Sequence, residues 1–551
     1  MKPAFLLRAV CILVLSSGFS ALKVDFARAN AVSINDIIAT SIKGALSIAP
    51  KKQGEWKAYS ALKPLYANNG YKPLWSNEGK VKSQARQLIE ALESAGEEGL
   101  IPENYPTGPL SQKMAEVRGK KLTTQNLISL ARFDLLFSNA FLIYASHLAH
   151  GFVNQESFKP VWFNSEGQGP LIQTLYKAVN NKNLKNVLYS LLPRETGYSQ
   201  LKEAVKKYKE IVANGGWKSI PLGPKIEPLG HSPRIPLVRE RLSIEDYFPK
   251  SQKDKHFYDE KLVEAVKTYQ HNNGLFEDGV IGDQTISSFN VSAQTRLNQI
   301  VSNLDRMRAF PNDPGPSYIY VNIPAFYLNL VEKGNVVLTM KTITGRKERP
   351  SPLLSHKITY MVISPKWHVP TSIAVKDKLP LLQKDPNFLA NNDMKLYSSE
   401  GKSLKEIDPS TVNWAEITPE NFSYSIIQQP GEGNALGSIK FMFPNKHNVY
   451  LHDTSQPELF ARQFRNFSSG CIRIEKPMEL ADYVLRGNKE WTSEKINAAI
   501  TNKEEQYVPL KNPLAIHLVY RTAWIDEQEV LQLRNDVYEA DKEMMAFLHI
   551  P

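Results

Sequence analysis

The spacing of apolar residues changes near the middle of the 551-residue chain. Between about residues 33 and 215, apolar positions recur every three or four residues, which is the period of an amphipathic helix. Residues 126–149 form a long apolar stretch of this kind. We therefore predict that the first part of the chain is mainly helical. One predicted helical face consists of Val81, Ala85, Leu88, Leu92 and Ala95.

From Tyr318 onward, apolar and polar residues alternate instead. A period of two is typical of strands that bury one face. Two alternating stretches flank Lys333-Gly334-Asn335, which predicts a hairpin turn, and residues 358–363 and 438–443 predict further strands. We expect a mostly antiparallel β domain over residues 316–524.

A small helical module is predicted between these two parts. Residues 216–236 are rich in proline and glycine, which indicates a boundary. A short amphipathic helix at residues 262–270 ends at Asn273-Gly274 and is followed by a tight turn. A second helix begins near Asp283. These features predict a module over residues 235–300.

Residues 375–424 interrupt the strands of the β domain and are too long for a hairpin loop. We interpret them as a capping subdomain that closes over the thiol site as a lid. The alternative is a family-specific insertion that does not open and close the site. The predicted fold class is multidomain α+β. It comprises a helical scaffold at residues 32–220, the helical module, the β domain with its capping insertion, and a C-terminal tail at residues 525–551.

Residues 1–31 have the layout of a secretory signal peptide. Lys2 and Arg8 form a basic start, residues 9–22 are apolar, and small residues follow. We expect no other stretch to be long and apolar enough to cross a membrane. One of the two cysteines, Cys11, lies in this leader, so Cys471 is the cysteine expected in the exported chain.

The net charge of the chain is +11 at pH 7, and the basic residues are interspersed with acidic ones. A basic protein can bind nucleic acid, anionic lipid or an acidic cell-wall polymer. No RNA or DNA motif accompanies the charge, so no nucleic-acid partner is expected. His147 and His150 are spaced like metal ligands, but no further ligand is evident nearby. We interpret them as a packed helix end and expect no metal.

Cys471 is the candidate nucleophile, and His452 lies 19 residues upstream of it. A free thiol has a pKa of about 8.5, and a nearby imidazole can take its proton. A lone cysteine is usually a small buried hydrophobe. The run 468–473, which follows the His452-Asp453 pair, nevertheless favours a catalytic role for Cys471. His368 is a competing base, but no cysteine motif lies near it.

The residues beside the thiol suggest further roles. Gly470 can adopt positive φ, so we expect the amides of Gly470 and Cys471 to face an oxyanion. The hydroxyls of Ser468 and Ser469 can orient the imidazole. Arg473 supplies a cation, either for a substrate carboxylate or for a buried structural pair.

His452, followed by Ser468-Ser469-Gly470-Cys471-Ile472-Arg473, resembles the signature of the L,D-transpeptidases, the YkuD-type catalytic domain. Many members of this family have histidine where Ser469 stands and glycine where Asp453 stands. The third member of the catalytic set therefore stays open, and a backbone or hydroxyl group within Ser468–Gly470 is preferred.

Other stretches resemble the same group of proteins. Residues 262–282 resemble a type 1 peptidoglycan-binding module, although such modules can also be structural or bind a protein partner. Trp367 with Val369-Pro370 resembles the family's Trp-x-Val-Pro stretch, and residues 430–437 resemble its Pro-Gly-x-x-Asn-x-Leu-Gly run. The domain order resembles the long YcbB-like branch, which adds a scaffold domain.

The resemblance implies a periplasmic, cysteine-dependent acyltransferase of cell-wall biogenesis and cell shape. Cys471 would attack a peptidoglycan stem peptide, His452 would transfer the proton, and a second stem would resolve the thioester into a 3→3 crosslink. Tyr450, Arg473 and Trp367 would bind substrate. Carbapenems would acylate the cysteine, and no metal or organic cofactor is implied.

The implied partners are the stem peptides and other cell-wall synthesis enzymes. The same thioester could instead be resolved by water, as in an L,D-carboxypeptidase, or by a lysine of a lipoprotein. A non-catalytic scaffold that binds the cell wall is an alternative of another class. The sequence leaves these acceptors and the oligomeric state open.

Overall fold

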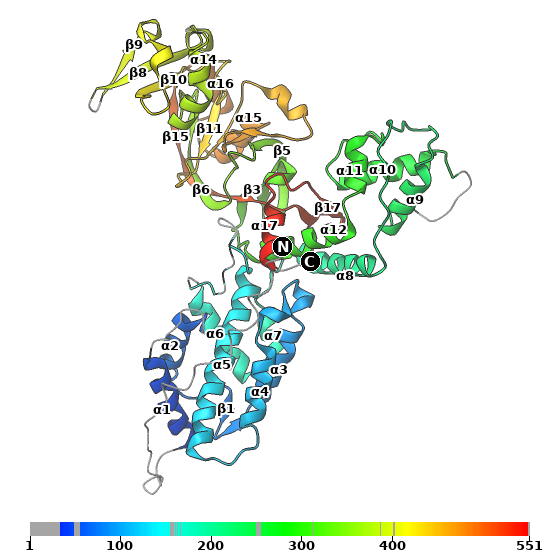
Figure 1. Ribbon diagram of the computed structural model, residues 1–551. Helices are drawn as coiled ribbons and strands as arrows, with labels where there is room; N and C mark the ends of the chain where they lie inside the picture. The colour runs from blue at the N-terminus through cyan, green and yellow to red at the C-terminus, as the bar shows by residue number, and fades with distance from the viewer. Residues whose placement is uncertain are drawn as a thin grey trace.

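The computed structural model describes residues 33–48, 56–154, 159, 161, 163–165, 167–248, 255–311, 313–385, 387–400 and 403–548. The predicted leader at residues 1–31, with Cys11, lies outside this part of the chain. Three bodies meet around α8 (Thr196–Ala213) and α12 (Ala293–Arg308). They are the elongated helical scaffold at the bottom of Figure 1, a small helical lobe, and a β domain. This arrangement confirms the predicted multidomain α+β class.

The scaffold is built around α5 (Thr124–His150), which contacts each of the other scaffold helices from α1 to α7. The helix begins where the Thr123 hydroxyl accepts the backbone N–H of Asn126 at 3.3 Å. It ends at Gly151, whose φ of +77° is accessible to glycine. Its neighbours are α1 (Ile34–Ser47), α2 (Tyr59–Asn68), α3 (Ser83–Glu93), α4 (Thr107–Val117), α6 (Gln168–Asn180) and α7 (Leu184–Tyr189).

The length and composition of α5 contradict one expectation from the sequence. The helix has 27 residues and a mean hydropathy of 1.4 in its most apolar window, so it is long and apolar enough to cross a membrane. However, 72% of that window is buried inside the protein. A helix in the core of a helical domain is buried to this extent because neighbouring helices cover all its sides.

The small lobe contains α9 (Ile235–Ile244), α10 (Glu260–Asn272) and α11 (Asp283–Phe289), which confirms the predicted pair of helices around a glycine turn. Asp259 caps α10 by accepting the backbone N–H of Leu262 at 2.9 Å. The turn is fixed by Gln270, whose side chain accepts the N–H of Gly279 at 2.8 Å and donates to the carbonyl of Val280 at 3.0 Å. This lobe is the predicted module.

Helix α12 lies between the three bodies, a position that no motif in its sequence predicted. It is rich in polar residues, yet all of it except Gln294 and Thr295 is buried. These polar side chains can be buried because several of them form hydrogen bonds with each neighbouring body. Without such bonds, their burial would cost free energy of folding. The links run to the module, the C-terminal segment and the scaffold, through Arg296–Asn273 (3.0 Å), Gln299–Thr522 (3.0 Å) and Arg308–Glu98 (2.7 Å).

The β domain is a nine-stranded sheet in the order β13-β5-β14-β12-β11-β6-β15-β3-β4. The sheet closes on itself because β4 also pairs with β5. Most strand pairs are antiparallel, as predicted, but β12–β14, β13–β5 and β15–β3 are parallel. The strands are β3 (Ser317–Asn322), β4 (Tyr327–Glu332), β5 (Asn335–Gly345), β6 (Leu354–Ile363), β11 (Ile439–Met442), β12 (Leu451–His452), β13 (Asn466–Ser468), β14 (Ile472–Ile474) and β15 (Gln506–Val519).

Two helices, α15 (Pro477–Val484) and α16 (Ser493–Thr501), pack against this sheet. The C-terminal segment is not a free tail. It forms a hairpin of β16 (Ala523–Ile525) and β17 (Leu531–Leu533), and then α17 (Ala540–Leu548), which packs against α12. Residues 549–551 lie outside the described part.

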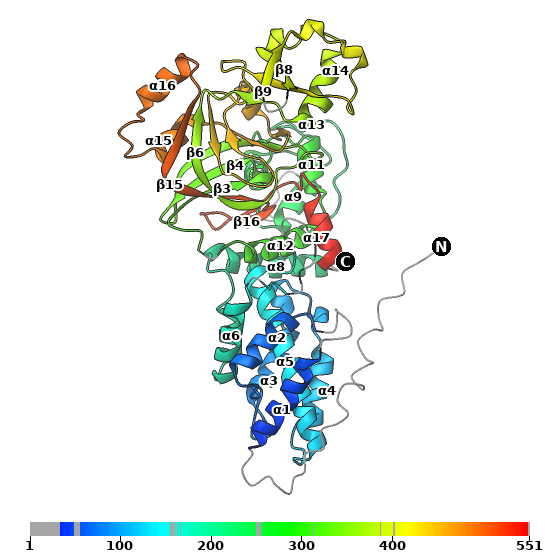
Figure 2. The same ribbon diagram turned by 90° about the vertical axis from the view of Figure 1, so that its left-hand side faces the viewer.

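The capping insertion folds around its own core and lies at the end of the molecule farthest from the scaffold (Figure 2). Its four-stranded sheet has the order β7-β10-β8-β9. The insertion therefore extends from residue 367 to residue 428, which is wider than the predicted 375–424, because its first and last strands pair with each other. The strands are β7 (Trp367–His368), β8 (Met394–Glu400), β9 (Ser403–Ile407) and β10 (Tyr424–Gln428), with α14 (Leu379–Leu382) among its helical turns.

Candidate active site

The parallel pairing of β12 with β14 brings the two halves of the cysteine signature together. Leu451 is opposite Ile472, and His452 is opposite Arg473. Tyr450 and Cys471 directly precede these pairs, and residues two apart on a strand share one face of a sheet. Cys471, Tyr450, His452 and Arg473 therefore share one face, whereas Leu451 and Ile472 are fully buried on the other.

The Cys471 thiol is held by Tyr450. Both the phenol and the backbone N–H of Tyr450 hydrogen-bond to it and lower its pKa. Burial has the larger effect and raises the pKa of Cys471 to about 11. The thiol is therefore protonated at neutral pH in the free protein, so its proton has to be taken up when the sulfur reacts. Tyr450, expected to bind substrate, contacts the sulfur itself.

The imidazole of His452 is buried and fixed by one hydrogen bond. Its Nδ1 lies 2.6 Å from the carbonyl oxygen of Asp453. A carbonyl only accepts, so Nδ1 carries the proton and Nε2 keeps its lone pair. Burial, together with the charges of Arg473 and Lys440, lowers the pKa of His452 to about 3. The ring is therefore neutral at neutral pH and can act as a base through Nε2.

The group that orients the imidazole is the backbone carbonyl of Asp453, and no contact between His452 and the preferred stretch Ser468–Gly470 is found among the described residues. The Asp453 carboxylate holds this turn in place by accepting the N–H of Ser438 at 2.8 Å. Gly437 lies against the same carboxylate, with φ of +62°, and a Cβ there would come within 2.4 Å of the Asp453 Cγ. Gly437, the last residue of the run 430–437, thus allows the chain to lie against the Asp453 carboxylate beside the imidazole.

The turn before Cys471 is stabilised by Ser468. Its hydroxyl donates to the carbonyl of Cys471 at 2.5 Å and accepts the N–H of Gly470 at 3.1 Å. Gly470 has φ of +118°, as its glycine identity allows. Its amide is already occupied, which argues against the expected role as an oxyanion donor. The amide of Cys471 has no acceptor among the described residues.

Ser469 connects this turn to the cap. Its hydroxyl accepts a hydrogen bond from Arg349 Nη1 at 3.0 Å. The same guanidinium forms a bidentate pair with Asp377, a residue of the cap, with Nη2 to Oδ1 at 3.0 Å. The cap is thereby attached beside the thiol, and its closure as a lid stays a prediction.

Lys440 also belongs to this face, although no motif in the sequence includes it. It is opposite His452 in the pairing of β11 with β12, and its Nζ lies 5.8 Å from the centre of the Tyr450 ring. Burial lowers the pKa of the lysine, and the carboxylate of Glu505 and the nearby Cys471 offset only part of this effect. The alternation of β11, with Ile439 and Phe441 buried, is the signal that could have placed Lys440 on the site face.

The other predicted substrate residues are placed differently. Arg473 Nη1 donates to Gln456 at 3.0 Å and to Thr454 at 3.3 Å, while its buried Nε has no acceptor among the described residues. Trp367 is in the cap, where the Lys378 ammonium lies 5.5 Å from its ring, and no contact with the thiol is found among the described residues. The exposed His368 beside it is also in the cap.

The histidines considered as metal ligands lie in the scaffold. His147 is buried, and its Nδ1 lies 2.9 Å from the Tyr105 hydroxyl. Its ring also packs edge-on against Phe152. Within the described ranges there is no group of three or more residues suited to hold a metal ion.

We expect the alkylation rate of Cys471 to rise about tenfold per pH unit between pH 7 and pH 10. The reason is that the reactive thiolate fraction follows a pKa of about 11. Intact-mass measurement of iodoacetamide addition tests this. The urea-unfolded protein is the control, and its rate should level off near pH 9, because a free thiol has a pKa of about 8.5. A folded-state rate that is flat above pH 7 would contradict this assignment.

Comparison with known proteins agrees with this geometry. The family model described as "L,D-transpeptidase catalytic domain" matches residues 316–492. The chain carries an L,D-transpeptidase catalytic domain. The models described as "Scaffold domain" and "Putative peptidoglycan binding domain" match residues 60–205 and 231–288. The residues matched by the L,D-transpeptidase model include His452 and Cys471.

A protein of Haemophilus influenzae (strain ATCC 51907 / DSM 11121 / KW20 / Rd) named "Putative L,D-transpeptidase" is 29% identical over 289 residues. The match covers 52% of this chain and 56% of that relative, so the chain matches only about half of the relative's length. A crystal structure of an L,D-transpeptidase from Xylanimonas cellulosilytica DSM 15894 is 13% identical and covers 54% of this chain and 98% of its own. Its TM-score of 0.18 is too low to support a structural argument.

Proposed function

We propose that this chain is a periplasmic L,D-transpeptidase that forms 3→3 crosslinks between peptidoglycan stem peptides. The observation that carries the proposal is the shared face of Cys471, Tyr450 and His452, where Nε2 is the ring nitrogen available for proton transfer. The peptidoglycan-binding and L,D-transpeptidase domains support peptidoglycan as the substrate. Export and the periplasmic location rest on the predicted leader.

In the proposed first half-reaction, the Cys471 sulfur attacks the carbonyl carbon of the third residue of a tetrapeptide stem. His452 Nε2 accepts the thiol proton as the C–S bond forms, because neither group is charged beforehand at neutral pH. The amide of Cys471 stabilises the oxyanion. When the C–N bond breaks, His452 returns the proton to the departing D-alanine amine, which leaves a thioester on Cys471.

In the second half-reaction, the side-chain amine of another stem attacks the thioester. His452 accepts the amine proton, and the departing sulfur regains a proton when the C–S bond breaks. Arg473 is suited to bind a substrate carboxylate. Because the charge of Arg473 lowers the pKa of His452, an anion that pairs with Arg473 would raise this pKa and make the imidazole a stronger base. No step of this proposal requires a metal or an organic cofactor.

The products made from disaccharide-tetrapeptides test this proposal. The mature protein is incubated with these fragments, and the mixture is analysed by mass spectrometry. A dimer linked 3→3, together with released D-alanine, is the expected result. Loss of D-alanine without dimers would show an L,D-carboxypeptidase, and binding without turnover would show a scaffold; either result would overturn the proposal. Carbapenem should add its mass to Cys471 and to no other residue.

A further inference from the structure

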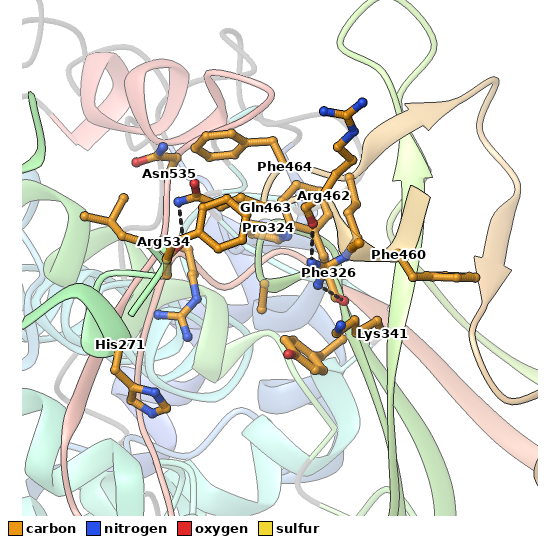
Figure 3. A pocket seen from close by; sticks show the side chains of 17 residues that line it. His271, Pro324, Phe326, Lys341, Phe460, Arg462, Gln463, Phe464, Arg534 and Asn535 are labelled. Carbon is orange, nitrogen blue, oxygen red and sulfur yellow. Dashed lines mark hydrogen bonds between the residues drawn. The ribbon is translucent and has the colours of Figure 1, made fainter. Parts of the chain in front are cut away.

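A pocket of 230 Å³ lies where the module meets the β domain, away from the thiol (Figure 3). One wall is the turn that follows α10 in the module, which includes Phe276. The opposite walls are the β3–β4 turn, with Tyr327, and residues 460–465, which precede the cysteine loop. The chain after β17 completes it with Arg534. The pocket is thus formed jointly by the peptidoglycan-binding module and the L,D-transpeptidase domain.

The lining of this pocket is cationic. It contains Lys341, Arg462, Arg465 and Arg534, and no aspartate or glutamate. Lys341 lies 3.8 Å from Glu475, a residue outside the lining. None of the three arginines forms an ion pair with a carboxylate among the described residues. The pocket therefore has an excess of positive charge that an anion would neutralise.

The two less exposed arginines are bonded only to neutral acceptors. Arg465 is buried, and its guanidinium donates to backbone carbonyls, including that of Phe326 at 2.9 Å. Arg534 donates to the carbonyl of Asn272 at 3.0 Å, and burial lowers its pKa to about 10. Asp526 and Glu475 act on Arg534 and Arg465 electrostatically, but neither carboxylate forms an ion pair with them. A partly desolvated guanidinium without a direct ion pair is costly, so a carboxylate bound here gains more than it would at an exposed arginine.

Other groups in the pocket suit a peptide. Gln463 donates through Nε2 to the carbonyl of Gly274 at 3.0 Å, while its buried Oε1 has no partner among the described residues. Phe276 and Tyr327 are 56% and 38% exposed, so their rings are available for apolar contact. Gly274, with φ of +65°, gives Arg534 room, because a Cβ there would lie 2.4 Å from its Cδ.

We propose that this pocket binds a carboxylate-bearing peptide stem of peptidoglycan, in addition to the stem that reacts at Cys471. The proposal deepens the proposed function, on which its choice of polymer rests. A peptide stem supplies a carboxylate for Arg534 and Arg465, an amide donor for Gln463 Oε1, and aliphatic groups for the exposed rings. The polymer would then be held by the module and the L,D-transpeptidase domain together.

Calorimetric titration of disaccharide-tetrapeptides tests the pocket. The mature chain with Cys471→Ala is used, so that no turnover occurs. Besides the donor and acceptor stems at Cys471, one further fragment should bind per chain, and the additional Arg534→Gln change should weaken only that fragment, about tenfold or more, since a charge-assisted hydrogen bond is lost. Lys333→Gln is the matched control; it removes the same charge from an exposed turn at the far end of β4 and should leave all fragment sites intact.

Two further measurements make the test decisive. Phe276→Ala removes an exposed ring without affecting the core, and it should weaken the same site about threefold or more; it substitutes for Arg534→Gln if that variant melts early. Fragments whose carboxylates are amidated cannot pair with Arg534. They should therefore bind at the pocket equally weakly to the Cys471→Ala chain with and without Arg534→Gln. Inorganic phosphate at equal concentration should compete poorly, because it cannot contact the rings or Gln463.

The same number of bound fragments with the same affinities in the Arg534→Gln, Phe276→Ala and Lys333→Gln chains would overturn the pocket proposal. Phosphate that displaces the fragment at equal concentration would also overturn it, because the site would then be a general anion site. The proposed function fails by a separate result, namely the absence of crosslinked product from the protein that retains Cys471. The binding test uses a chain without the thiol and does not depend on that outcome.

Discussion

Replacing Cys471 with alanine is expected to lower the rate of crosslink formation by at least about a thousandfold, because no other group can form the thioester. The rest of the site would remain, since Tyr450 and Ser468 are held by backbone contacts of the strands and the turn. Quantifying dimers by mass spectrometry measures this effect. Cys471 is the free thiol of the described residues, so alkylation should be lost in parallel.

Two controls separate the loss of chemistry from the loss of folding. Alanine is smaller than cysteine by one sulfur atom, so the melting temperature should change by only a few degrees. Binding of tetrapeptide fragments should persist in the variant. Crosslinks formed at an undiminished rate by a correctly folded Cys471→Ala chain would refute the thioester route, whichever acceptor the enzyme uses.

Replacing His452 with glutamine is expected to lower the acylation rate of Cys471 by about a hundredfold to ten-thousandfold. Glutamine can still donate a hydrogen bond to the Asp453 carbonyl, but its amide has no basic nitrogen to take the thiol proton. The rate is measured in single turnover from the mass of the acylated protein. His368→Gln makes the same substitution at an exposed position of the cap and serves as the matched control.

The pH profile distinguishes the loss of a base from a distorted site. Because the pKa of His452 is about 3, the imidazole is in its basic form from pH 5 to pH 8, and the wild-type acylation rate should change little over that range. Without the imidazole, the rate should follow the thiolate fraction and rise about tenfold per pH unit. A His452→Gln profile parallel to that of the wild type would contradict the role of His452 as the base.

The strand pattern and the signature motif predicted much of the fold and the pair at the centre of the site. A period of two is a local property, so the strands of the β domain could be read from the chain. The approach of His452 to Cys471 could not be derived from period alone, because it depends on a parallel pairing of two short strands. The resemblance to the L,D-transpeptidases supplied it.

The remaining features of the site depend on contacts that a linear pattern does not contain. The carbonyl that fixes the imidazole belongs to Asp453, and any residue type provides a carbonyl at that position. The occupied amide of Gly470 depends on a turn closed by Ser468. The shifted pKa of Cys471 follows from burial, which is set by the packing of distant segments. Lys440 becomes a site residue only through its register with His452.

Helix α12 explains another difference, because its polar composition resembles that of a surface helix whereas the structure buries it. Its guanidinium and amide groups need acceptors from the scaffold, the module and the C-terminal segment simultaneously. A chimaera that exchanges one lobe with a related protein would therefore leave some of these donors without acceptors. The unit that can recombine during evolution is a lobe together with the matching face of α12, and this restricts which combinations of cell-wall modules can arise.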